Sequence, residues 1–189
     1  MPSIDTADLF EQEAFSDITI QSGNRQFKVH KLVICQHEYF NSLCGPNTPF
    51  AERNQQTIEL KDDNEDAVAA MLRWIYTSEY DTTWAGFTID AFLFHVKVYS
   101  VADKYQLLPL KLLAKKRINT VMASCTTDTL FAMTKFEGVY GDRWVLHWLG
   151  KCDNQRLKAM LHHGDFLDYL KDDGELSGQI IALLRDRLP

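Results

Sequence analysis

Residues 17–44, DITIQSGNRQFKVHKLVICQHEYFNSLC, predict a β-hairpin that runs directly into a helix. Ile18 and Ile20 alternate with polar neighbours, as in a strand with one buried face. Gly23 lies in a turn sequence, because glycine tolerates a positive φ, and the alternation then resumes in a second strand. From residue 32 onward the apolar spacing becomes helical.

The helical part of this stretch predicts one continuous apolar face. The residues that can share it are Leu32, Val33, Tyr39, Phe40 and Leu43. A hairpin and one helix bury little surface by themselves, so further elements must close over them.

The bulk composition bounds the class of protein. A chain of 189 residues with 46% hydrophobic residues can form one large or two small packed domains. The net charge of −6 argues against a nucleic-acid-binding surface, which needs a basic field. No apolar run is long enough to span a bilayer, and residues 1–15 lack the features of a secretory signal. We therefore expect an intracellular protein, in the cytoplasm or nucleus, with no nucleic-acid or membrane partner.

Four cysteines, at positions 35, 44, 125 and 152, form no Cys-x-x-Cys motif. In an intracellular protein we expect them to be reduced, as small core or surface residues. A zinc site could draw on His30, Cys35, His37 and Cys44, but structural zinc needs four converging ligands, and residues two apart on one helix do not share a face. The sequence also lacks a phosphate-binding loop or a catalytic serine motif. It predicts no enzyme, no metal and no cofactor.

The acidic run from Asp62 to Asp66 has the spacing of a calcium loop. Ala67 and Arg73 stand where such a loop needs glycine and a bidentate acid. Acidic residues also cap the start of a helix and meet the positive end of its dipole, which is the interpretation that we prefer here.

Further elements follow along the chain. A strand is expected at residues 57–60, and three helices are expected after Asp66, after Asp90 and from Pro109. Beyond a boundary near residues 123–127, short helices are expected to stop at glycines, including Gly164 and Gly174.

Three ordered motifs resemble the BTB/POZ family. The motifs are Ser16-Asp17-Ile18 with Phe27, His30-Lys31-Leu32-Val33 and Tyr39-Phe40; Trp74 to Tyr80; and Val101-Ala102-Asp103-Lys104-Tyr105 with Leu110. The resemblance implies an α+β fold, a small β-sheet edged by a helical cluster, followed by an all-α extension similar to the 3-box or BACK region. The implied division is a lead at 1–15, a BTB/POZ domain at 16–123 and the helical extension at 124–189.

The family resemblance also implies a dimer surface. The residues that match its buried charged pair are Asp17 and Lys31, which would sit partly buried at the dimer floor; alternatively, they are strand-end residues that face water. Leu9 and Phe10 in the lead would belong to the dimer surface, unless they, with Phe15, only cover the edge of the domain.

A cullin contact is the second implication of the resemblance. Phe50-Ala51-Glu52 matches the hydrophobic-x-Glu segment that precedes the third strand of BTB adaptors, in which the hydrophobic residue fills a cullin pocket and the acid supports the contact. Tyr76 is a further candidate contact, although its helical position beside Ile75 equally fits packing.

The resemblance therefore implies a protein-interaction module that binds a cullin as a substrate adaptor of a cullin-RING ubiquitin ligase and forms a homodimer. The alternative is a self-assembling scaffold or transcriptional co-regulator that binds no cullin. The sequence contains no MATH, kelch or zinc-finger segment, so an unknown substrate protein would meet the helical extension or an exposed BTB surface.

Overall fold

The structure is a computed structural model, and it describes residues 6–10, 12, 15–45, 56–80, 89–124, 126, 149–172 and 174–185. The elements in chain order are α1 (Thr6–Leu9), β1 (Ile18–Ser22), β2 (Arg25–Val29), α2 (Lys31–Ile34), α3 (Glu38–Cys44), β3 (Thr57–Glu59), α4 (Glu65–Thr77), α5 (Ile89–Lys104), α6 (Leu108–Ser124), α9 (Asn154–Leu161), α10 (Gly164–Asp172) and α11 (Gly174–Arg185). The chain divides into two compact units, residues 1–83 with 94–116, and residues 84–93 with 117–189. The α+β fold predicted from the sequence is confirmed.

The sheet of the first unit has the strand order β2-β1-β3. The predicted hairpin is present, with Ile18 opposite Val29, and Gly23 has a φ of +53° in its turn. β3 pairs parallel to β1, with Ile20 opposite Ile58. Thr19 of the central strand β1 is buried as well as Ile20, and its hydroxyl accepts from Lys28 Nζ at 3.1 Å, whereas the sequence alternation predicted only one buried face.

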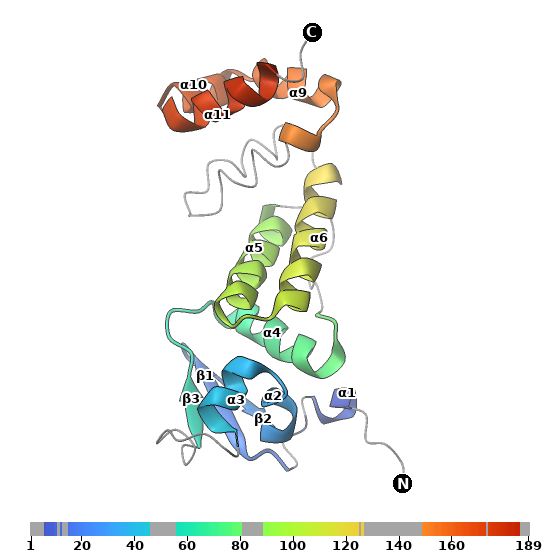
Figure 1. Cartoon of the computed structure of the whole chain (residues 1–189), viewed down its shortest axis with the longest axis vertical. Coiled ribbons are helices and arrows are strands. Elements are labelled where there is room, and N and C mark those ends of the chain that lie inside the picture. The colour runs from blue at the N-terminus through green and yellow to red at the C-terminus, as the bar shows by residue number, and fades with distance from the viewer. Residues whose placement is uncertain are drawn as a thin grey trace. The chain divides into compact units, whose positions relative to one another are not determined.

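The predicted continuous helix after the hairpin is two short helices, α2 and α3, which lie beside the sheet in Figure 1. His37 breaks the helix with an extended backbone, at φ −99° and ψ 134°. The buried side chains of α2 are Val33 and Ile34, whereas Leu32 is 82% exposed, and Phe40 is buried in α3. The prediction of one shared apolar face was therefore wrong at Leu32.

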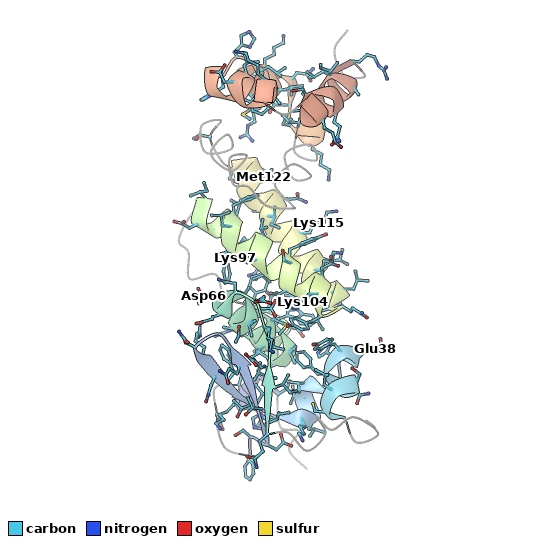
Figure 2. The ribbon with its side chains drawn as sticks, turned by 90° about the vertical axis from the view of Figure 1, so that its left-hand side faces the viewer. Glu38, Asp66, Lys97, Lys104, Lys115 and Met122 are labelled. Atoms are coloured by element: carbon cyan, nitrogen blue, oxygen red, sulfur yellow. The ribbon has the colours of Figure 1, made fainter. Side chains whose placement is uncertain are left out.

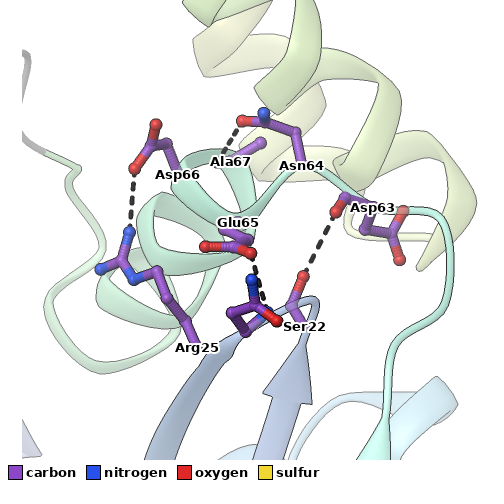
Figure 3. A network of polar contacts seen from close by, with 8 residues as sticks. Ser22, Arg25, Asp63, Asn64, Glu65, Asp66 and Ala67 are labelled. Atoms are coloured by element: carbon purple, nitrogen blue, oxygen red, sulfur yellow. Dashed lines mark hydrogen bonds and ion pairs between the residues drawn. The ribbon is translucent and has the colours of Figure 1, made fainter.

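The acidic run before α4 caps this helix and links it to the hairpin turn (Figure 3). The side chain of Asn64 accepts a hydrogen bond from the backbone N–H of Ala67 at 3.2 Å, which confirms a capped start and assigns the cap to Asn64. Glu65 accepts from the backbone N–H of Asn24 at 2.8 Å, and Asp66 pairs with Arg25 at 2.8 Å. These carboxylates contact different partners of the fold rather than converging on a cation.

Asp63 connects this capping region to the end of α5. Its side chain is only 7% exposed, and it accepts hydrogen bonds from Lys104 Nζ at 2.8 Å and from the hydroxyl of Tyr105. Lys104 lies in the last turn of α5, at the level of α4 in Figure 2. Burial, reinforced by the bond to Asp63, raises the pKa of the Tyr105 hydroxyl well above its usual range, so Tyr105 stays a donor. The contacts join the loop before α4 to the helix that carries the Asp-Lys-Tyr motif.

Side chains from both the strands and the helices form the core of the first unit. The fully buried members include Ile20, Phe40, Met71, Leu72, Ala102, Tyr105 and Leu110. The helices α4, α5 and α6, which the sequence predicted, supply Met71, Leu72, Ala102 and Leu110.

The last described helices, α9, α10 and α11, belong to the second unit. Asp153 caps α9 by accepting from the backbone N–H of Arg156 at 2.8 Å, and Leu157, Met160, Phe166 and Ile180 are buried. Gly164 and Gly174 were predicted to stop helices, but each is the first residue of the next helix. Within the described residues, no helix has the length and apolar character needed to cross a membrane.

We predict that Asp63→Ala destabilises the protein by about 1–3 kcal/mol, because it leaves the buried hydroxyl of Tyr105 without its acceptor. The measurement is the free energy of unfolding in urea. Asp66→Ala is the matched control: its ion pair with Arg25 is exposed, and such pairs contribute about 0–1 kcal/mol. Equal losses in the two variants would contradict the role assigned to Asp63.

Candidate interaction surface

Asp17 and Lys31 are brought together at the point where the hairpin passes into α2. The Asp17 carboxylate accepts a hydrogen bond from the backbone N–H of Lys31 at 2.7 Å, and the Asp17 N–H donates to the carbonyl oxygen of Val29 at 3.2 Å. His30, the N-cap residue of α2, makes no side-chain capping bond. Asp17 therefore satisfies one of the free N–H groups at the start of this helix and places a negative charge at its positive end.

Two large apolar side chains flank this contact and are open to solvent. Phe15 lies two residues before Asp17 and is 91% exposed, and Leu32 follows Lys31 and is 82% exposed. They are the most exposed of the large hydrophobic residues in the described part of the chain. The sequence did not reveal this surface, because Leu32 matched the spacing of a buried helical face, whereas α2 buries Val33 and Ile34 instead. We call Phe15, Asp17, Lys31 and Leu32 the hairpin-end surface.

The two lead residues predicted for the dimer surface, Leu9 and Phe10, are half-buried and pack on the core of their own chain. The ring of Phe10 lies 5.5 Å from that of Tyr76, and the guanidinium of Arg73 lies 5.6 Å from the centre of the Phe10 ring. Thr6 in α1 donates to the carbonyl oxygen of Tyr76 at 2.9 Å. In the single chain these contacts hold α1 along α4.

Tyr76, a candidate cullin contact, is only 4% exposed. Its hydroxyl accepts from the backbone N–H of His30 at 2.8 Å and lies 3.0 Å from Nδ1 of the same histidine. Burial raises the pKa of Tyr76 to about 12, so the hydroxyl remains protonated. A direct contact with a cullin would need exposed surface that Tyr76 does not have in the single chain.

The other two candidate cullin contacts, Phe50 and Glu52, lie outside the described residues. They belong to the stretch between Cys44, where α3 ends, and Thr57, where β3 begins.

The possible zinc ligands do not converge. His30 contacts Tyr76, and the ring of His37 lies 5.7 Å from that of Trp74, where burial lowers the pKa of the imidazole. Only Cys35 and Cys44 meet, with their sulfur atoms 3.0 Å apart. Among the residues that the structure describes, no group of three or more histidine, cysteine or acidic side chains could hold a metal ion.

Comparison with known proteins gives one family and several relatives. The sequence model of the BTB/POZ domain matches residues 6–120. Human Rabankyrin-5 is 30% identical over 116 residues, which are 61% of this chain and 9% of that protein. BTB and MATH domain-containing protein 42 of Caenorhabditis elegans is 31% identical over 105 residues, 54% of this chain and 24% of the relative, and protein 40 of the same name and organism is 29% identical over 133 residues. The chain covers 9% to 32% of the length of these relatives.

We predict that Tyr76→Phe lowers the free energy of unfolding by about 1–3 kcal/mol, because the buried backbone N–H of His30 loses its acceptor. Chemical denaturation measures the change. Tyr39→Phe is the control, since no hydrogen bond of the Tyr39 hydroxyl occurs among the described residues, and it should change stability by less than about 0.5 kcal/mol. A Tyr76→Phe variant as stable as the parent would show that the hydroxyl has no such role.

Proposed function

Because the chain belongs to the BTB/POZ family, whose domains mediate protein–protein interactions, we propose that it acts as a substrate adaptor of a cullin-RING ubiquitin ligase and associates with a second copy of itself. The matched region, residues 6–120, includes the whole sheet, the hairpin-end surface and the stretch between α3 and β3. In this role the chain supplies binding surfaces, and the ligase chemistry resides in partner subunits.

The proposed cullin contact is the segment Phe50-Ala51-Glu52, and the observation that supports it is its place in the sequence, between α3 and β3. β3 pairs parallel to β1, so the chain must cross from the end of the hairpin to the other side of β1 before β3 begins. Phe50 and Glu52 precede Thr57, the first residue of β3, in the chain, and they lie within the region that matches the BTB/POZ domain. An aromatic anchor with an adjacent acid is the composition expected for a small binding hot spot.

The proposed self-association uses the hairpin-end surface. Phe15 and Leu32 expose apolar side chains on either side of Asp17, and covering them with a second copy removes this apolar area from water. A two-fold dimer brings the same patch together from both chains, so each side chain contributes twice. Asp17 keeps its hydrogen bond from the Lys31 N–H when it becomes partly buried, which offsets its loss of hydration.

A substrate would meet another part of the chain. The extension at residues 124–189 exposes Leu167 on α10 and Ile181 on α11, and these side chains offer apolar contact points. We assign substrate binding to this extension, and the cytoplasm or nucleus as the place where the adaptor works.

We predict that Phe50→Ala weakens binding to a cullin N-terminal domain by about 1–4 kcal/mol, because it removes the anchor side chain. Calorimetry on the full chain measures this change, and light scattering on the same samples should show unaltered self-association. Leu108→Ala is the control, since Leu108 is an exposed apolar residue on α6, outside both proposed surfaces, and it should leave cullin binding and self-association unchanged. If the Phe50→Ala variant unfolds, Phe50 is a core residue and the site assignment is wrong.

We predict that Leu32→Ala weakens self-association at least about tenfold, because the lost contact is repeated on both sides of a two-fold interface. Sedimentation equilibrium over a range of concentrations measures the dissociation constant. Leu108→Ala is the control, since Leu108 is also an exposed leucine at 61% but lies on α6. A parent chain that stays monomeric would contradict the proposal.

The two experiments also separate the adaptor from the alternative function. A dimer that depends on Leu32 but shows no cullin binding would favour a self-assembling scaffold or transcriptional co-regulator. Cullin binding that is lost in Phe50→Ala would favour the adaptor.

A further inference from the structure

Two cysteine side chains meet at the corner between α2 and α3. Cys35 directly follows α2, and Cys44 is the last residue of α3. Their sulfur atoms are 3.0 Å apart, and both thiols also lie near the carbonyl oxygen of Phe40, at 3.7 Å and 3.3 Å. Both cysteines are free thiols in the structure. A disulfide bond is about 2.05 Å long, so the two sulfurs need to approach by only about 1 Å.

The two thiols differ in their access to solvent. Cys35 is half-buried and can be reached from outside, whereas Cys44 is 4% exposed. An external reagent would therefore react first at Cys35, and Cys44 would be held in place to complete the reaction. This is the arrangement of an attacking and a resolving thiol.

We propose that Cys35 and Cys44 form a site of reversible oxidation, at which a small-molecule disulfide such as oxidised glutathione converts the two thiols into an intramolecular disulfide. This modification does not depend on cullin binding. It adds covalent chemistry at the α2–α3 corner to the interaction role of the family.

The reaction has two thiol–disulfide exchange steps. Deprotonated Cys35 attacks one sulfur of oxidised glutathione, forms a mixed disulfide and releases one glutathione thiolate, which takes up a proton. Cys44 then loses its proton, attacks the Cys35 sulfur and releases the second glutathione as a thiol. In total, the two protein thiols are oxidised by two electrons, and one oxidised glutathione becomes two reduced molecules.

The surroundings of Cys35 set the speed of the first step. Burial, followed by the contact with Cys44, raises the pKa of the Cys35 thiol to about 12, and the nearby charge of Asp17 acts in the same direction, while Lys31 opposes it. Little thiolate is therefore present near neutral pH. Exchange with oxidised glutathione is slow near neutral pH, and it accelerates as the pH rises.

Peptide mapping of the full chain tests the proposal. Trypsin cleaves after Lys31 and Arg53 and at no residue between them, so one peptide, 32–53, contains both Cys35 and Cys44. Cys125 and Cys152 fall in other tryptic peptides. The reduced protein is incubated with oxidised glutathione at pH 8, its remaining thiols are alkylated in acid, and the digest is analysed by mass spectrometry.

We expect peptide 32–53 to appear without alkylation and with a mass two hydrogen atoms below that of the dithiol form, and we expect dithiothreitol to restore the dithiol. The ratio of this internal disulfide to the glutathione adduct should be at least about tenfold higher in the folded chain than in urea, because the fold holds the thiols together. Equal ratios, or a peptide that carries glutathione or alkyl groups at both cysteines, would overturn the proposal.

Two variants complete the test. The Cys35→Ser variant removes the half-buried cysteine of the pair, so peptide 32–53 should no longer form the internal disulfide. The remaining buried thiol of Cys44 should react slowly with oxidised glutathione. Cys152→Ser is the matched control: Cys152 is a buried cysteine whose thiol donates to the carbonyl oxygen of Leu149, and its loss should leave oxidation of peptide 32–53 unchanged. If Cys44 in Cys35→Ser reacts as quickly as Cys35 does in the parent chain, the assigned order of attack is wrong.

Discussion

The buried carboxylate of Asp63 is the constraint around which the first unit is arranged. A carboxylate with 7% exposure needs compensation, and here the compensation comes from Lys104 and Tyr105 at the end of α5. Two neighbouring residues of the acidic run also make contacts within the first unit. Asn64 caps α4, and Glu65 accepts a hydrogen bond from the backbone of the hairpin turn. The sheet, α4 and α5 are thus tied together by polar contacts that have direction, in addition to the apolar core, which has none.

A second set of directed contacts shapes the surface that we assign to self-association. The hydroxyl of Tyr76 holds the backbone of His30, and the carboxylate of Asp17 holds the next N–H, at Lys31. These two bonds fix the first turn of α2 at the end of the hairpin. Within α2, Val33 and Ile34 are buried and Leu32 is exposed. A residue with the sequence character of a core leucine is in this way available to a second chain.

Most side chains that the sequence offered as metal ligands contact other side chains of the fold in the described part of the chain. Carboxylates of the acidic run meet Lys104, Tyr105 and Arg25, while His37 packs against Trp74. The cysteines at 35 and 44 are the exception, because each is the other's neighbour. Their meeting adds a possible covalent tie between α2 and α3 to a domain whose family role is binding.

The sequence by itself determined the α+β class, the hairpin, the third strand and the helices α4, α5 and α6. These features depend on local periodicity and capping, which neighbouring residues encode. The three motifs likewise identified the family. Only the tertiary structure decided that Thr19 of β1 is buried, that Leu32 is exposed and that Tyr76 is buried. It also brought Asp63 to Tyr105, and Cys35 to Cys44. The physical reason is that exposure and contact depend on how separate elements pack, which no short stretch of sequence encodes.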